Sequence, residues 1–152
     1  MNVESFEEPG FVFMATKKGV VKKTSLDEFK RQWKVGKKAI KLDPDDELVG
    51  STLTDGEKFI MLVSQSGKAV FFDEKEARSM GRAARGVKGI NLGKDDQVIS
   101  LLVPEKENTI FTVSENGYGK RTNVDDFRKT RRGAKGVIAM QTSDRNGLLI
   151  GA

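Results

Sequence analysis

Short apolar runs recur along this chain at nearly equal spacing, and each is followed by a turn that contains glycine. Phe, Ile, Val and Met dominate these runs, which is the composition of β-strands. The third turn, Asn116-Gly117, is the dipeptide most typical of a two-residue β-hairpin. The pattern predicts three hairpins, with outgoing strands at residues 11–16, 59–64 and 109–114 and returning strands at residues 20–24, 68–72 and 118–122.

Each predicted hairpin is followed by a short segment that is acidic at its front and basic behind. That order of charge suits the dipole of a single helical turn, which we predict at residues 25–31, 73–80 and 123–129. Two more strands follow in each unit, separated by turns rich in Asp, Asn and Gly. These strands are predicted at residues 39–42 and 48–53, at residues 87–92 and 98–103, and at residues 137–142 and 148–151.

A second glycine marks the period most regularly, because Gly36, Gly86 and Gly136 are separated by 50 residues each time. Self-similarity at a fixed period indicates units that bury their apolar faces against one another. Four strands in about 50 residues match a propeller blade, so the pattern predicts an all-β, propeller-like fold. A β-solenoid or tandem small barrels would give similar periodicity. We interpret the chain as one domain or part of one, residues 1–152, with repeats at approximately residues 11–58, 59–108 and 109–152.

Charge changes sign in step with this repeat. Lys and Arg number 27 against 22 Asp and Glu, so the net charge of +5 is moderate. Residues 16–41 carry ten basic and two acidic side chains, whereas residues 42–58 carry one basic and six acidic. Residues 78–94 are again basic, residues 95–116 acidic and residues 120–135 basic. In equivalent repeats, this alternation places positive charge on one rim and negative charge on another.

The chain contains no cysteine and no histidine. This composition excludes thiol chemistry, disulfides, the usual zinc sites and a histidine general acid or base. No apolar run approaches the length of a membrane span, and residues 1–10 are acidic, unlike a signal peptide. We therefore expect a soluble, cytoplasmic chain with no membrane partner.

Basic and small residues are combined immediately before each second glycine, in segments that we call the basic loops: residues 33–38, 81–88 and 130–136. Small residues let backbone amides approach a partner closely, and Arg and Lys supply charge and donors. Together they suit phosphate oxygens. For a single segment, glycine serving a turn beside solvated cations is the simpler interpretation. Three segments in register favour a phosphate-binding surface.

The third basic loop, Thr-Arg-Arg-Gly-Ala-Lys-Gly, resembles the Gln-Arg-Arg-Gly-Gly-Lys-Gly box in the A subunit of DNA gyrase, departing from it at Thr130 and Ala134. Other stretches resemble the C-terminal domain of that protein in the same order along the chain. They are residues 13–16 with 21–24, 36–42, 117–122, 135–138 and 145–148. The resemblance covers essentially the whole chain. The C-terminal domain of the topoisomerase IV A subunit, which has more degenerate blades, is the nearest related family.

The resemblance implies a β-pinwheel, a six-bladed propeller-like disc that wraps duplex DNA around its basic perimeter. By the order of motifs the chain corresponds to middle and later blades, roughly the third to the fifth. In the family the full box belongs to the first blade, so residues 130–136 resemble its degenerate counterpart, with Gly133 and Gly136 as a box-like turn. This segment can still line the path of the DNA.

The resemblance also implies a place in a larger enzyme. The parent is an ATP-dependent, supercoiling type IIA topoisomerase, and this chain is its non-catalytic, DNA-handling part. The implied partners are duplex DNA, the rest of the gyrase A subunit, and the gyrase B subunit. We expect no cofactor and no metal in this chain, because ATP and Mg²⁺ act elsewhere in the parent complex.

Basic residues in the returning strands and the basic loops are the candidate DNA contacts. Duplex DNA is stiff over about 150 base pairs, so bending a short stretch costs several kcal/mol, which phosphate contacts along a curved surface offset. Binding should depend strongly on salt and little on sequence, and with about six phosphate contacts log affinity should fall with log salt at a slope of about −5. The candidates are Lys22, Lys23, Lys37, Lys38, Arg82, Arg85, Lys88, Lys120, Arg121, Arg131, Arg132 and Lys135.

Three features invite a catalytic or binding role that we do not expect. Tyr118 follows a hairpin glycine with no base nearby in the sequence, and in the family the active tyrosine lies in another domain. Trp33, the only tryptophan, is expected to anchor against the neighbouring blade rather than to stack on DNA. The pairs Asp45-Asp46, Asp95-Asp96 and Asp125-Asp126 are interpreted as polar turn residues rather than magnesium ligands.

Two other classes of function are alternatives. A protein-binding propeller would present aromatic hot spots on its faces, but only 7% of residues are aromatic. A propeller hydrolase would need a cluster of polar catalytic groups at its centre, which the sequence does not indicate. Three repeats also leave blade edges open at both ends. We expect the isolated chain to form an open arc or to pair with a second copy, three blades with three.

Overall fold

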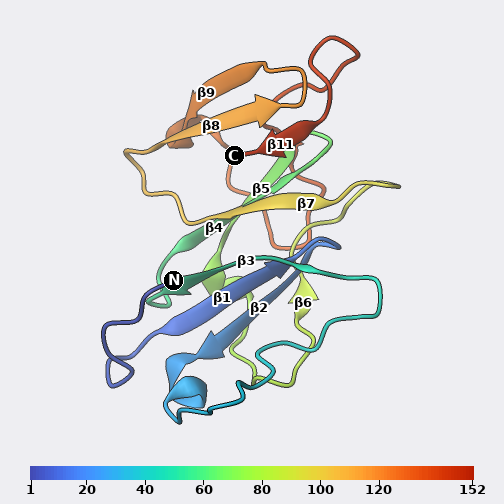
Figure 1. Ribbon diagram of the computed structural model, residues 1–152. Helices are drawn as coiled ribbons and strands as arrows, with labels where there is room; N and C mark the ends of the chain where they lie inside the picture. The colour runs from blue at the N-terminus through green and yellow to red at the C-terminus, as the bar shows by residue number, and fades with distance from the viewer.

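The computed structural model describes residues 1–152 and is built from strands, three short 3₁₀ helices and connecting loops (Figure 1). Its strands form three antiparallel sheets stacked one above another. The first sheet contains, in order, β3 (Leu48–Thr54), β1 (Phe11–Thr16), β2 (Val20–Ser25) and β6 (Val87–Lys88). The second contains β10 (Val137–Ile138), β5 (Lys68–Asp73), β4 (Phe59–Ser64) and β7 (Val98–Leu102). The third contains β11 (Leu149–Gly151), β8 (Thr109–Ser114) and β9 (Gly119–Asn123).

The three predicted hairpins are confirmed as β1–β2, β4–β5 and β8–β9. Each turns at a glycine in the left-handed region, with φ of 82° at Gly19, 85° at Gly67 and 82° at Gly117. The predicted helical turns are also confirmed, as η1 (Leu26–Phe29), η2 (Glu74–Glu76) and η3 (Val124–Asp126). Side-chain oxygens of Ser25 and Asp73 cap η1 and η2 by accepting from backbone amides two residues on.

The outer strand of each complete sheet belongs to the following repeat. Strand β6, from the second repeat, pairs with β2 of the first, and β10, from the third repeat, pairs with β5 of the second. The prediction that each repeat supplies its own four strands is therefore wrong. Residues 39–42 form no strand, because no preceding hairpin edge lies beside them, and the third sheet has three strands rather than four. The inner strands predicted at residues 48–53, 98–103 and 148–151 are confirmed as β3, β7 and β11.

The hydrophobic core lies between the sheets, where consecutive repeats meet. In one cluster, Phe13 of the first repeat packs with Leu62 and Phe72 of the second, and the two Phe rings are 6.5 Å apart. In the next, Met61 of the second repeat packs with Ile110 of the third. Burying each such side chain contributes about 1.5–3 kcal/mol. Because both faces of a middle sheet are buried, its strands are continuous apolar runs rather than alternating ones.

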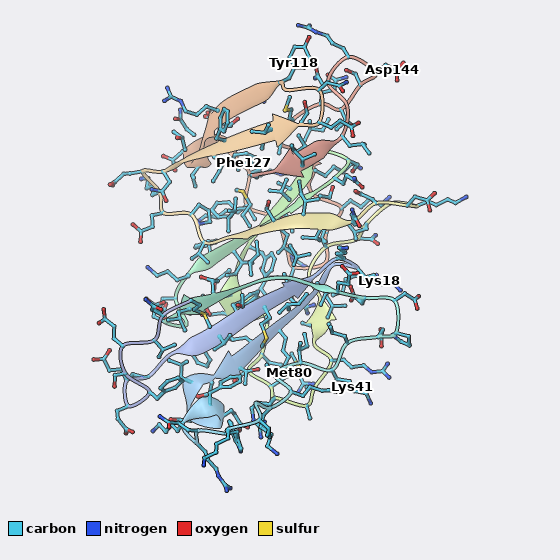
Figure 2. The ribbon with its side chains drawn as sticks, viewed as in Figure 1. Lys18, Lys41, Met80, Tyr118, Phe127 and Asp144 are labelled. Carbon is cyan, nitrogen blue, oxygen red and sulfur yellow. The ribbon has the colours of Figure 1, made fainter.

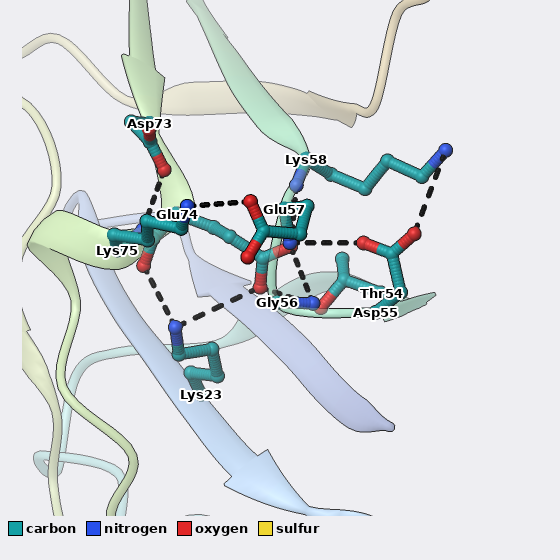
Figure 3. A network of polar contacts seen from close by, with 9 residues as sticks. All are labelled: Lys23, Thr54, Asp55, Gly56, Glu57, Lys58, Asp73, Glu74 and Lys75. Atoms are coloured by element: carbon teal, nitrogen blue, oxygen red, sulfur yellow. Dashed lines mark hydrogen bonds and ion pairs between the residues drawn. The ribbon is translucent and has the colours of Figure 1, made fainter. Parts of the chain in front are cut away.

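A buried polar network also joins the first two repeats (Figure 3). The Glu74 carboxylate is fully buried and accepts hydrogen bonds from the backbone amides of Gly56 (3.0 Å) and Lys58 (2.8 Å) and from the Thr54 hydroxyl (2.8 Å). Lys23 Nζ lies 3.7 Å from this carboxylate and donates to the Glu74 carbonyl oxygen at 2.9 Å. Breaking such a buried pair would leave an uncompensated charge, so the network sets the orientation of one repeat on the next.

The sheets have distinct inner and outer edges. Strands β3, β7 and β11 each end one sheet, and β7 lies against both of the others. Strands β6 and β10 form the opposite edges of the first and second sheets, which we call the outer edges. The second and third basic loops lead directly into β6 and β10 and so lie at this outer edge. None of the helices is long and apolar enough to span a membrane.

Candidate nucleic-acid interface

The glycines of the basic loops allow these loops to lie against the neighbouring sheet. Gly86 has φ of +106° and Gly136 has φ of +84°, a region that disfavours other residues. A Cβ atom at Gly86 would also collide with the carbonyl oxygen of Val21, and one at Gly136 with that of Ala69. The motif glycine therefore serves close packing between repeats, and it presents the cations that precede it along the outer edge.

Backbone hydrogen bonds join the three basic-loop regions into one continuous edge. The Lys41 amide donates to Ala84 O at 3.1 Å, which ties the first repeat to the second basic loop. The Asn91 amide donates to Ala134 O at 2.8 Å, which makes the same link one repeat later. Figure 2 labels Lys41 and Met80, which belong to these adjacent repeats, in the lower part of the molecule. Cations that are far apart in the sequence therefore follow one another along a single surface.

Arg132 is used largely to hold the third repeat on the second. Its Nε donates to Glu76 O at 2.9 Å, and its Nη1 donates to Lys88 O at 2.6 Å. Its backbone amide donates to the Glu76 carboxylate at 2.9 Å. The guanidinium is still half-exposed, but two of its donor nitrogens are already occupied by the protein. Within the box-like segment, Arg132 is therefore a structural cation.

Arg82 occupies the equivalent position in the second repeat and also contacts the preceding repeat, but through an aromatic ring rather than through carbonyl oxygens. Its guanidinium stacks on the ring of Trp33 of the first repeat, with 4.6 Å between the guanidinium carbon and the ring centroid. Its Nε lies 3.9 Å from the Glu28 carboxylate. The expectation that Trp33 anchors against the neighbouring repeat is confirmed, and its ring is covered by Arg82.

Other candidates from the basic loops are exposed. Arg85 Nη1 lies 3.2 Å from the Asp43 carboxylate, an exposed pair that contributes little to stability. The remaining exposed candidates in the basic loops form no ion pair within the chain, so their charges are available to a partner. The exposed candidates at this edge are Lys37, Lys38, Arg85, Lys88, Arg131 and Lys135.

Lys22 and Lys23 do not reach the surface. Lys22 is fully buried, and its Nζ donates to Ala39 O at 2.6 Å and to Arg82 O at 2.5 Å. Lys23 is 6% exposed and belongs to the network around Glu74. The expectation that these two lysines contact DNA must be corrected, because strand β2 is covered by the following repeat and both ammonium groups are used inside the protein.

Lys120 and Arg121 lie on β9, which is the uncovered outer strand of the third sheet, and both are exposed. Lys120 is the positional equivalent of Lys22 and donates to Ala139 O at 3.3 Å, as Lys22 donates to Ala39 O. The two residues line a hollow beside β9 that is also bounded by Val137 and Ile138 of β10, directly after the third basic loop.

Several exposed cations in the same segments were missed by the sequence reasoning. Arg128 and Lys129 join Arg131 and Lys135 in lining a hollow beside the third basic loop. Lys129 Nζ also lies 3.9 Å from the centroid of the Phe59 ring of the second repeat. Lys34 lies within the first loop and Lys41 follows it. The segment-wide count of basic residues already contained these positions, and it was a better guide than the motif alone.

The acidic turns have a structural role. One Asp46 carboxylate oxygen accepts from the Lys18 and Glu47 amides at 3.0 and 2.9 Å, and Asp96 accepts from the Ser66 amide at 2.9 Å in the same arrangement. Their interpretation as turn residues is confirmed. No group of three or more acidic side chains in the structure could hold a metal ion.

The two lysines at the turn of the first hairpin form ion pairs with the neighbouring acidic turn. The Lys18 ammonium lies 2.8 Å from the Asp45 carboxylate, and this hydrogen bond raises the pKa of Lys18 and lowers that of Asp45. Lys17 pairs with Glu47 in the same turn. Positive charge at these turns is thereby offset, and the uncompensated positive charge is left at the basic loops.

A family model described as the DNA gyrase C-terminal domain, beta-propeller, matches the chain three times, over residues 10–55, 58–105 and 108–152. The chain belongs to this family. It is similar to the A subunits of DNA gyrase from Escherichia coli (strain K12), with 53% identity over 85 residues, and from Chlamydia pneumoniae, with 44% identity over 88 residues. These regions cover 56% and 57% of the chain but only 10% and 11% of the two relatives. The matched region is thus about a tenth of their length.

Solved structures of this family have the same fold. The C-terminal domain of DNA topoisomerase IV superposes with a TM-score of 0.90 at 32% identity, over 98% of this chain and 47% of that one. The DNA gyrase A C-terminal domain superposes with a TM-score of 0.86 at 25% identity, over 98% of this chain and 50% of that one. The all-β pinwheel predicted from the sequence is confirmed, and the chain corresponds to about half of such a domain.

Proposed function

We propose that this chain binds duplex DNA without sequence preference along the outer edge formed by its basic loops, and that it bends the DNA around this edge. The proposal rests mainly on one observation: backbone hydrogen bonds between repeats join the three loops, so that exposed cations follow one another on a continuous edge. Phosphates lie along the duplex at regular intervals, and a row of cations in register with a repeating fold is suited to them.

The stacking of the sheets supports bending rather than straight binding. Each repeat adds one sheet and one basic loop to the stack, and the inner strands β3 and β11 both contact β7. We infer from these contacts that the sheets converge on this side. The outer edge is therefore the convex side of the arc. Because DNA resists bending, contacts spread along a convex basic edge are the means to hold it curved.

The parent enzyme is proposed to be DNA gyrase, with this segment as part of its A subunit. Family membership and the similarity to gyrase A subunits support this assignment. In such an enzyme the chain would handle DNA in the bacterial cytoplasm, while cleavage, ATP hydrolysis and the Mg²⁺ they need would be supplied by the B subunit, together with other parts of the A subunit. The A subunit of topoisomerase IV is the second candidate parent, because the solved C-terminal domain of that enzyme is similar at 32% identity.

The first experiment measures the affinity of the chain for a mixed-sequence linear duplex as a function of salt. We compare the double variant Lys88→Gln, Lys135→Gln with a matched control, Lys94→Gln, Lys106→Gln; all four lysines are exposed. Lys88 and Lys135 lie in the basic loops, whereas Lys94 and Lys106 lie in acidic stretches or at their border. Loss of two phosphate contacts should reduce the salt slope by about 2 and leave the control at the wild-type slope.

Bending is measured on the same duplex by energy transfer between dyes at its two ends. Steep salt dependence with a shortened end-to-end distance is the expected result. Binding at an unchanged distance would mean that the chain holds DNA without bending it. No binding at low salt, or equal effects of the two double variants, would contradict the proposed edge and favour a protein-binding platform.

A further inference from the structure

The acidic turn of one repeat lies beside the basic loop of the next repeat, at a contact that we call a joint. At the first joint, Asp43 of the first acidic turn (residues 43–47) and Arg85 of the second basic loop line the same hollow of about 210 Å³. The backbone holds these two segments together, because the Lys41 amide donates to Ala84 O at 3.1 Å. A carboxylate therefore borders the edge that we propose for DNA.

An ion pair already occupies one cation of the edge at this joint. Arg85 Nη1 lies 3.2 Å from the Asp43 carboxylate, and the two side chains are 64% and 47% exposed. An exposed pair of this kind contributes little to stability. A phosphate binds the same guanidinium donors as a carboxylate, so it has to displace Asp43 in order to bind Arg85. Asp43 is therefore placed to compete with DNA.

Within the first acidic turn, Asp43 is the carboxylate that pairs with a basic loop. Asp45 and Glu47 pair with the two lysines of the first hairpin. Asp46 accepts hydrogen bonds from the backbone amides of Lys18 and Glu47, in its own repeat. The other three carboxylates are thus used inside the first repeat, and competition with DNA is assigned to Asp43 alone.

The second joint has the same backbone arrangement without the competing carboxylate. The Asn91 amide donates to Ala134 O at 2.8 Å, which places the second acidic turn beside the third basic loop. Gly93 stands at the position of the aspartate, and Lys135 stands at the position of the arginine. Lys135 is exposed and forms no ion pair within the chain. Its charge is therefore available in full.

We propose that the acidic turns set how much positive charge each joint offers to DNA, and that the two joints are unequal: Asp43 competes with phosphate for Arg85 at the first, whereas Lys135 is free at the second. This inference rests on the proposed binding of DNA along the edge. It implies that the duplex is held more tightly at the third basic loop than at the second. Both joints are formed entirely by residues of this chain.

Exchanging the residues at the two turns tests the inference, with salt-dependent binding to the mixed-sequence duplex as the measurement. Asp43→Asn frees Arg85, so it should strengthen binding about twofold to fivefold and steepen the salt slope by about 1. Gly93→Asp places a carboxylate beside Lys135 and should produce the opposite changes. Space is available for it, because nothing lies within 4 Å of the Cβ position at Gly93.

Two controls separate this effect from a general change of charge. Glu105→Gln breaks a similar exposed pair, in which Lys58 Nζ lies 3.5 Å from the Glu105 carboxylate. Glu105 follows the inner strand β7, whereas the basic loops lie at the outer edge. This variant changes the net charge as much as Asp43→Asn does, yet it should bind like the wild type. Gly93→Asn adds a side chain of the same size without the charge and should also bind like the wild type.

A double variant tests the pair itself. Arg85→Gln should weaken binding only slightly in the wild-type background, where Asp43 already occupies the guanidinium, and more strongly in the Asp43→Asn background. The gain from Asp43→Asn should accordingly disappear when Arg85 is replaced. Such non-additivity is expected of two residues that act through one contact, and a general change of charge would not produce it.

The same titrations distinguish failure of this inference from failure of the proposed function. Equal binding by the wild type and Asp43→Asn, an equal gain in Glu105→Gln, or a gain that persists without Arg85 would overturn the inference and leave the binding of DNA by the edge intact. Absence of binding by the wild type at low salt would contradict the proposed function, and the inference with it.

Discussion

Lys22 in strand β2 is a buried lysine with a structural role. Lys22 is surrounded by protein and hydrogen-bonds two carbonyl oxygens, one in the first repeat and one in the second. Burial, together with the nearby positive charge of Arg82, lowers the pKa of Lys22 to about 8, and Glu28 opposes this shift. Through these two hydrogen bonds, Lys22 connects strand β2 to a loop of the first repeat and to a loop of the second.

This pKa predicts a rise in stability with pH. Between about pH 8 and pH 10.5 the unfolded chain keeps the proton of Lys22 while the folded chain loses it, so the free energy of unfolding increases through this window. One proton accounts for a slope of at most about 1.4 kcal/mol per pH unit. Lys22→Met should remove this contribution, so the stability of the wild type relative to the variant should grow from pH 8 to pH 10.5.

Urea unfolding at a series of pH values measures the effect. Lys94→Met, the same change at an exposed lysine, is the control and should follow the wild-type profile. A constant difference between wild type and Lys22→Met across the window would contradict the assigned pKa.

At the scale of the element, the glycine that ends each basic loop can meet two structural requirements. It adopts a positive φ, which is a local requirement, and it lets the chain approach a carbonyl oxygen of the preceding repeat, which is not local. The three equivalent positions separate these requirements, because Gly36 has only the first and Gly86 and Gly136 have both.

Alanine substitutions should therefore differ in cost. Gly36→Ala should destabilise the chain by about 1–2 kcal/mol, the cost of placing a Cβ in the left-handed region. Gly86→Ala should cost about 1–3 kcal/mol more, because the new methyl overlaps the Val21 carbonyl oxygen. Urea unfolding of both variants measures the difference. Equal losses would show that the loop does not pack as described.

At the scale of the molecule, the two larger apolar clusters lie between the repeats, and only the smallest lies within one repeat. The cluster that contains Ile110 and Leu149 of the third repeat is completed by Met61, Ala69 and Phe71 of the second. In such arrays each unit is stabilised mainly by its interfaces with its neighbours.

A fragment with residues 109–152 alone should accordingly be unfolded, because its apolar residues lose the second repeat. A fragment with residues 59–152 keeps that entire cluster and should retain sheet structure, with a lower midpoint of thermal unfolding than the full chain. Circular dichroism of the two fragments decides the matter. Cooperative unfolding of residues 109–152 alone would contradict this account.

Much of the fold could be predicted from the sequence, because its signals are local. An apolar run, a glycine turn and a returning strand form a hairpin through bonds between neighbours in the chain, and all three hairpins were found at their predicted places. The acidic-to-basic segments became 3₁₀ turns for the same reason. The spacing of Gly36, Gly86 and Gly136 identified the repeat, whereas the resemblance of residues 130–136 and other motifs indicated the family.

The candidate site was predictable only in outline. Charge counts located the basic loops, but they could not distinguish Lys88, whose side chain is exposed, from Lys22, which is buried under the following repeat. They also could not show that Arg132 donates to carbonyls of the second repeat. Burial and hydrogen bonding of a side chain depend on residues more than 40 positions away, which no local pattern contains.

The repeat, the hairpins and the alternation of charge follow from the amino-acid sequence alone, since each depends on backbone geometry and residue type within a few positions. Which repeat completes which sheet depends instead on the folded molecule as a whole. Residues 39–42 are equivalent to β6 and β10, yet they form no strand because strand structure requires an edge to pair with. A strand is therefore a property of two segments together, and the second segment comes from another part of the fold.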